Sequence, residues 1–141
     1  MKPVHTPLEN FESFLGSEKG KNALATLRTF ILPMEEEFQR VKKAVPVTLT
    51  EEARKRYMDF DIVGQELKKH LMYSGLLIEF AWEEWTEGLE IVQGIRKIPG
   101  ISPFKILKLL SVIMYMEKDN NSFLDDSIKN GMVLKLVKGL F

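Results

Sequence analysis

The chain has 141 residues, 45% of them hydrophobic, and its 20 basic and 20 acidic side chains give a formal net charge of zero. We expect a single helical domain over residues 1–141, because this length suits one domain and this much apolar material argues against disorder. There is no cysteine, which excludes disulfides, thiolate metal sites and a cysteine nucleophile. The N-terminus is polar and no apolar run reaches the roughly 18 residues of a membrane span. We therefore expect a cytoplasmic protein with no membrane partner.

The charges are divided unevenly along the chain. Residues 1–95 hold 12 basic and 16 acidic side chains, a net of −4, and residues 96–141 hold 8 and 4, a net of +4. We expect this asymmetry to let the two halves attract each other or an identical copy. The alternative is a basic contact patch, formed by Lys105, Lys108, Lys129, Lys135 and Lys138. These lysines come without arginine or interleaved exposed aromatics, so a nucleic-acid partner is not expected.

The first half of the chain reads as loop and helix. Residues 1–7 contain two prolines and are predicted to be a flexible arm. Apolar residues at helical spacing predict helices over residues 8–15, 21–31 and 34–44. Pro33 should break the chain between the last two, because proline has no N–H and disfavours helix before it. Thr50 is a good N-cap for a further helix, or pair of helices, that runs to about residue 73.

The tryptophan region combines a short apolar segment with an amphipathic pattern. Residues 76–80 form the only short strand that the sequence suggests, and this strand has no partner with which to make a sheet. Trp82, Trp85, Leu89 and Val92 fall on one seam, which predicts an amphipathic helix. Its outer face is acidic and carries Glu83, Glu84, Glu87 and Glu90.

The most apolar helix is predicted over residues 103–117. Ser102 followed by Pro103 is typical of a helix start, and the residues that follow are apolar nearly all round. Such a helix must be surrounded by others. Two shorter helices follow, one capped by Ser122 and one over residues 132–140. The sequence therefore predicts an all-α fold, a compact bundle of five to seven helices around a buried central helix.

The search for catalytic chemistry finds no constellation. His70 and His5 are the only histidines, and neither has a ligand or catalytic partner at helical spacing. There is no nucleophile elbow and no glycine-rich phosphate loop. We therefore expect no catalytic residue, no metal site and no cofactor, and we do not expect an enzyme.

One speculative ligand site remains, near the two tryptophans. Trp82 and Trp85 could floor an aromatic pocket, with Asp59 and Glu79 as its acidic residues. The phase of the tryptophans with the apolar seam favours a place in the core instead. The carboxylates are similarly better explained as a solvated face.

Residues from about 60 to 141 resemble a family of small, uncharacterised prokaryotic helical proteins, a domain of unknown function. The resemblance rests on the segment from Phe80 to Trp85, which is similar to the family's Phe-Asp-Trp-x-x-Trp motif, on the leucine-rich stretch at residues 107–111, and on Phe123, Gly131 and residues 133–136. Ala81 stands where the family tends to have Asp, and residues 115–120 replace an Arg-rich turn. The resemblance implies a helical fold and supplies no activity.

These observations favour a non-enzymatic protein-interaction or regulatory protein that binds another protein or an identical copy. The alternative is a small-molecule or nucleotide-binding domain, including a degenerate enzyme, with its pocket near the tryptophans. A small, cysteine-free helical chain is also compatible with an inhibitor from a mobile element, which nothing in the sequence selects.

Overall fold

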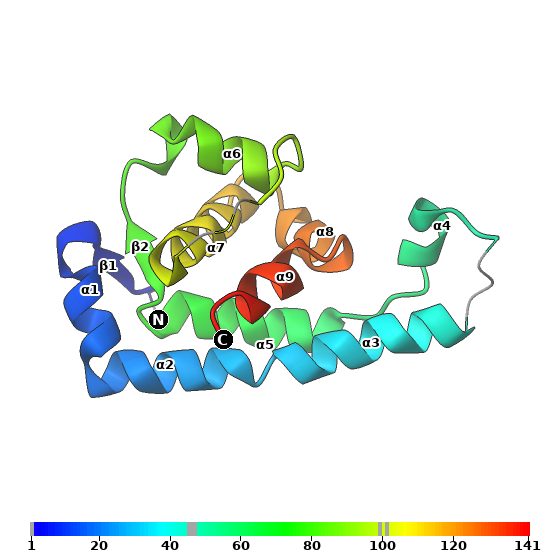
Figure 1. The fold of residues 1–141 in the computed structure, drawn as a ribbon, viewed down its shortest axis with the longest axis horizontal. Helices are drawn as coiled ribbons and strands as arrows, with labels where there is room; N and C mark the ends of the chain where they lie inside the picture. The colour runs from blue at the N-terminus through cyan, green and yellow to red at the C-terminus, as the bar shows by residue number, and fades with distance from the viewer. Residues whose placement is uncertain (1, 45–47, 99, 101) are drawn as a thin grey trace.

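The computed structural model describes residues 2–44, 48–98, 100 and 102–141 (Figure 1). Within these residues it contains nine α-helices, one 3-10 helix and two short strands. The helices are α1 (Leu8–Gly16), α2 (Glu18–Arg28), α3 (Ile31–Ala44), α4 (Glu51–Lys55), α5 (Asp61–Tyr73), η1 (Trp82–Glu84), α6 (Thr86–Val92), α7 (Pro103–Glu117), α8 (Phe123–Lys129) and α9 (Met132–Lys138). The all-α prediction is confirmed. The helix number exceeds the five to seven expected because short segments, such as the five residues of α4, form helices of their own.

The helix α7 lies at the centre of the bundle, as the sequence predicts. It packs against α6, α8, α9 and the strand β2 (Leu77–Glu79). Side chains on nearly every side of it are buried, including Leu110, which is 2% exposed. Ser102 begins the helix as its N-cap and accepts a hydrogen bond from the backbone N–H of Lys105 at 3.3 Å. A helix that is apolar all round is thus enclosed by the rest of the chain.

The structure corrects two predictions, the strand without a partner and the flexible arm over residues 1–7, of which residue 1 lies outside the described residues. Residues His5–Pro7 form the strand β1, which pairs in parallel with β2, with His5 opposite Leu77. The N–H of Val4 also donates to the carbonyl of Met72 at 2.7 Å. A three-residue strand has too little alternation to be recognised, and its partner lies some seventy residues away along the chain. No local sequence signal reports such a pairing.

The break predicted at Pro33 occurs slightly earlier in the chain. The helix α2 ends at Arg28 and α3 begins at Ile31, so Pro33 lies in the first turn of α3. Its missing N–H costs nothing there, because the first N–H groups of a helix have no partner within the helix. The pair α2–α3 runs along one side of the molecule, and α5 runs beside it (Figure 1).

The predicted amphipathic helix through both tryptophans is divided in two. Trp82 starts η1, and Trp85 occupies the non-helical N-cap position of α6 with φ −89° and ψ 80°. The indole of Trp85 folds back over Gly88, where an added Cβ would clash with the ring. The seam pattern that suggested one continuous helix therefore reflects two short elements joined by a bend.

Candidate functional site

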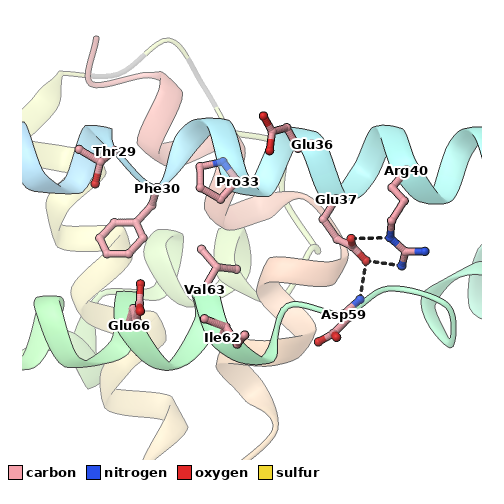
Figure 2. Close-up of a pocket in the computed structure, with 10 residues that line it drawn as sticks. All are labelled: Thr29, Phe30, Pro33, Glu36, Glu37, Arg40, Asp59, Ile62, Val63 and Glu66. Atoms are coloured by element: carbon pink, nitrogen blue, oxygen red, sulfur yellow. Dashed lines mark hydrogen bonds and ion pairs between the residues drawn. The ribbon is translucent and has the colours of Figure 1, made fainter.

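A groove with a volume of about 610 Å³ lies between α3 and α5 (Figure 2). We call it the acidic groove. Its lining residues come from the α2–α3 junction, α3, the segment before α5, and α5 itself. They are Thr29, Phe30, Pro33, Glu36, Glu37, Arg40, Asp59, Ile62, Val63 and Glu66.

The floor of the acidic groove is apolar. Phe30 is buried and Val63 half-buried, and Figure 2 shows both side chains between the two helices. Ile62, by contrast, has 77% of its surface exposed. It is out of phase with Val63, Leu67 and Leu71, which lie at four-residue steps on the inner face of α5. This isoleucine therefore lies outside the core and adds apolar surface to the lining of the groove.

The walls of the groove are acidic. Four carboxylates against one guanidinium leave a net charge of −3 on the lining. That guanidinium, Arg40, is already engaged: it donates two hydrogen bonds to Glu37, at 2.7 and 2.6 Å, and one to the carbonyl of Tyr57 at 2.6 Å. The hydrogen bonds from Arg40 are the main reason why the pKa of Glu37 lies below its usual value. Glu37 also accepts from the N–H of Asp59 at 2.6 Å, which holds the start of α5 against α3.

The other three carboxylates of the lining are not held in ion pairs. Glu36, Asp59 and Glu66 form no ion pair with any basic side chain in the described part of the structure. Asp59 accepts the N–H of Asp61 at 3.1 Å, a contact that leaves its charge in place. An apolar floor under unpaired carboxylates is suited to a basic ligand that carries a large apolar side chain.

A second hollow has the opposite charge. We call it the basic surface, a depression of about 760 Å³ lined by Gly94, Ile95, Arg96, Lys97, Ile98, Asn130, Gly131, Met132 and Lys135. Three basic residues and no acidic residue line it, a net charge of +3. Ile95 is 71% exposed. Glu90 offsets part of this charge, since Arg96 donates to it at 3.2 Å.

The acidic groove and the basic surface lie on different sides of the molecule. Residues 94–98 follow α6, which Figure 1 shows across α7 from the α3–α5 pair. In Figure 2 the groove faces the viewer and the C-terminal helices lie behind it. Residues 94–98 therefore lie across α7 from the groove of their own chain.

The four residues predicted to form a ligand site do not come together. Trp82 lies against the ring of Tyr115, with centroids 5.8 Å apart, and Trp85 packs edge-on to Phe80 at 5.9 Å. Both indoles are half-buried, so they are neither fully in the core nor the floor of an open pocket. Glu79 is exposed near them, whereas Asp59 lies in the acidic groove on the other side of α7.

The lysines considered as a basic patch are mostly engaged within the chain. Lys105 pairs with Glu87, Lys129 with Asp125 and Lys138 with Glu35. The ammonium of Lys108 lies 4.4 Å from the ring centre of Trp85 and 4.8 Å from that of Phe80. Burial in this aromatic setting lowers the pKa of Lys108. Only Lys135 belongs to the basic surface.

The two histidines have structural partners. The ring Nε2 of His70 is 2.8 Å from the carbonyl of Ala23, to which it donates, and this bond ties α5 to α2. The Nδ1 of His5 is 3.0 Å from the hydroxyl of Tyr115. Among the described residues, no group of three or more acidic or histidine side chains is arranged to hold a metal ion. Nor is any described helix both long and apolar enough to cross a membrane.

Fold and surface together define a small helical domain with two oppositely charged hollows. Residues 20–140 match the model of the Family of unknown function (DUF6508), and the chain belongs to this family. This finding confirms the resemblance to a domain of unknown function. No curated protein and no solved structure matches the chain. Both hollows lie within the matched residues, whereas β1 and α1 precede them.

Proposed function

We propose that this protein is a non-enzymatic interaction domain that associates with a second copy of itself. The basic surface of one copy docks into the acidic groove of the next. The observation that carries this proposal is the match in charge and apolar character between the two hollows. The lining charges are −3 and +3, and each hollow presents an isoleucine that is more than two-thirds exposed.

In the proposed contact, the opposite charges attract the two copies and fix how they align. The two exposed isoleucines add apolar contact between them. Unpaired carboxylates at Glu36 and Glu66 would face Lys97 and Lys135, which form no ion pair in the described structure. Charge complementarity of this kind raises the association rate and selects the partner. The contact joins two different surfaces, so it is a head-to-tail contact that builds rings or open chains.

A cytoplasmic location is part of this proposal. The chain carries no cysteine, which suits a compartment where disulfides do not form. The resemblance described above also suggests a prokaryotic source.

Two charge-reversal variants test the proposed contact. Glu36→Lys with Glu66→Lys makes the groove basic and leaves the basic surface intact. Lys97→Glu with Lys135→Glu reverses the basic surface and leaves the groove intact. Each variant alone carries like charges on both surfaces and should be monomeric. A mixture of the two should associate, because the intact basic surface of the first variant fits the intact groove of the second.

A control separates local contact from net charge. Glu9→Lys with Glu12→Lys changes the net charge by the same amount and in the same direction as the groove variant, on exposed positions of α1 away from both hollows. It should associate as the unmodified protein does. The proposal is contradicted if either reversed variant self-associates normally, or if the mixture stays monomeric.

A further inference from the structure

A smaller cavity, of about 170 Å³, lies beside the strand β1. It is separate from the acidic groove and the basic surface and shares no lining residue with either. Its lining comes from β1 and the residue pair before it, α5, β2, α7 and the turn after α7. The lining residues are Pro3, His5, Lys68, Met72, Leu77, Met114, Tyr115, Glu117, Lys118 and Asn121.

The cavity has an apolar floor and a polar mouth. Leu77 and Met114 are 2% and 4% exposed, and Met72 is half-buried beside them. Lys118 and Asn121 are exposed and mark the open side. An apolar recess with a few convergent polar groups is the usual form of a small-molecule site.

The charges around the cavity favour an anion. The carboxylate of Glu117 is fully engaged, because it accepts from the ammonium of Lys68 at 3.1 Å and from the N–H of Leu124 at 3.0 Å. Lys118 has no acidic partner among the described residues, and its ammonium lies 5.7 Å from the ring centre of Tyr115. The pair Lys68–Glu117 is neutral overall, so Lys118 leaves the lining with a net positive charge.

His5 has a free ring nitrogen at the same place. The hydroxyl of Tyr115 donates to the carbonyl of Ile78 at 2.6 Å, so its oxygen accepts from the Nδ1–H of His5 at 3.0 Å. This tautomer leaves Nε2 of His5 as an unprotonated acceptor without a partner in the described structure, so Nε2 takes no part in holding an anion.

The volume of the cavity limits what it can hold. An apolar cavity of about 150 Å³ accommodates one benzene ring, whereas pockets for drug-sized ligands are about 300–1,000 Å³. A cavity of about 170 Å³ therefore fits one ring or a short chain and excludes a nucleotide.

We propose that this cavity binds a small monocarboxylate whose apolar body is about the size of one aromatic ring. The carboxylate lies at Lys118, and the apolar body contacts Met72, Leu77 and Met114. This site is independent of the proposed self-association, and the charge-reversal variants of the two hollows should bind the ligand as the unmodified protein does.

Benzoate is a suitable probe, and benzyl alcohol is its neutral counterpart. With the full chain, calorimetric titration should show that benzoate binds about tenfold more tightly than benzyl alcohol. In the same titration followed by NMR, the methyl resonance of Met114 should shift, because that side chain lines the cavity. Equal affinities for the two probes, or no Met114 shift at saturating benzoate, would overturn the proposal.

A matched pair of lysine variants tests the carboxylate contact. Lys118→Met removes the exposed charge at the mouth and should abolish the preference for benzoate over benzyl alcohol. Lys21→Met removes an exposed charge from α2 and should leave the preference unchanged. If Lys118→Met keeps the tenfold preference, the proposed orientation of the ligand is wrong. Since Lys118 is exposed, the variant should fold, and its circular dichroism spectrum checks that it does.

Discussion

Ser111 is a fully buried hydroxyl in the apolar helix α7. Its Oγ accepts from the N–H of Ile78 at 2.9 Å and donates to the carbonyl of Leu107 at 2.8 Å. The backbone N–H of β2 that points toward α7 therefore has a partner in the interior. A hydroxyl in a leucine-rich stretch has no evident purpose in the sequence, and the structure supplies one.

Replacing this hydroxyl should be costly. Ser111→Ala leaves the N–H of Ile78 buried without a partner, and we expect a loss of about 1–3 kcal/mol in the free energy of unfolding. Urea denaturation measures the loss. Ser13→Ala, at an exposed position of α1, is the control and should change stability by less than about 0.5 kcal/mol. A Ser111→Ala loss as small as that of the control would contradict the assignment.

Tyr115 links three elements, and its ionisation should destabilise the folded protein. Burial, with a smaller effect from the charge of Glu79, raises the pKa of Tyr115 from 10.0 to about 12. Between these values the unfolded chain loses the phenolic proton while the folded chain keeps it, so stability should fall as the pH rises above 10. Below pH 10 Tyr115 keeps its proton in both states, so its full contribution to the free energy of unfolding is present.

The variant Tyr115→Phe isolates this effect. It lacks the hydroxyl and should be less stable at neutral pH, but it has no Tyr115 ionisation to lose. The stability difference between the two proteins should therefore narrow as the pH rises from 10 towards 12. Urea denaturation at a series of pH values measures the difference, and one that stays constant would show that the Tyr115 pKa is not raised.

At the scale of elements, α7 is where sequence and structure agree best. Ser102, Pro103 and the apolar run after them are local signals, and they suffice to place the helix and its burial. The same holds for Thr50, which caps α4 by accepting from the N–H of Ala53 at 3.2 Å. Helix caps and apolar periodicity involve residues that are close together in the chain, so they can be recognised in a single sequence.

Shortening one buried side chain of α7 tests whether this helix forms the core of the bundle. Leu110→Ala should lower the free energy of unfolding by about 2–5 kcal/mol, because it leaves a cavity in a packed core. The control is Leu32→Ala on α3, where the side chain is 62% exposed and its removal should change stability little. Thermal or urea denaturation of both variants gives the comparison. Equal losses would mean that α7 is not the core.

The pairing of β1 with β2 is the element that sequence alone could not reveal. It depends on residues that are far apart in the chain and on hydrogen bonds between backbones, which leave little trace in side-chain pattern. The bend at Trp85 was missed for a related reason, since it depends on the contact between an indole and Gly88.

Hydrogen exchange tests whether the N-terminal residues are held against the bundle, as β1 requires, rather than forming a flexible arm. The amide of Val4 donates to the carbonyl of Met72 at 2.7 Å, so we expect it to exchange much more slowly than the same amide in an unstructured peptide. Exchange followed by NMR at residue resolution measures this. Exchange at the unstructured rate would restore the flexible arm that the sequence predicted.

At the scale of the whole molecule, the opposed charges of the two halves are partly used within the chain. Lys138 of the basic half pairs with Glu35 of the acidic half at 2.9 Å, and Lys105 similarly pairs with Glu87. The acidic groove and the basic surface contain charged side chains that do not take part in these internal pairs. The charge asymmetry is visible in the sequence. Only the fold shows which of these charged side chains pair within the chain and which stay unpaired at the surface.

Most of the acidic groove could not be located from sequence. The sequence suggests Asp59 as an acidic residue of a ligand site near the tryptophans. In the structure Asp59 instead lines the acidic groove, and the suggested site does not form. The available signal was Ile62, which is out of phase with the buried face of α5. Such an exposed isoleucine indicates a contact surface, but its acidic neighbours on α3 become neighbours only when α3 and α5 pack together.

The most direct test of self-association is the molar mass in solution, measured by light scattering coupled to gel filtration at low and high salt. We expect a mass above that of the monomer at low salt, rising with protein concentration. The mass should fall towards 16.3 kDa at high salt, because exposed charges are screened beyond about 3 Å at 1 M ionic strength. A mass of 16.3 kDa at both salt concentrations, even in concentrated samples, would contradict the proposed head-to-tail contact.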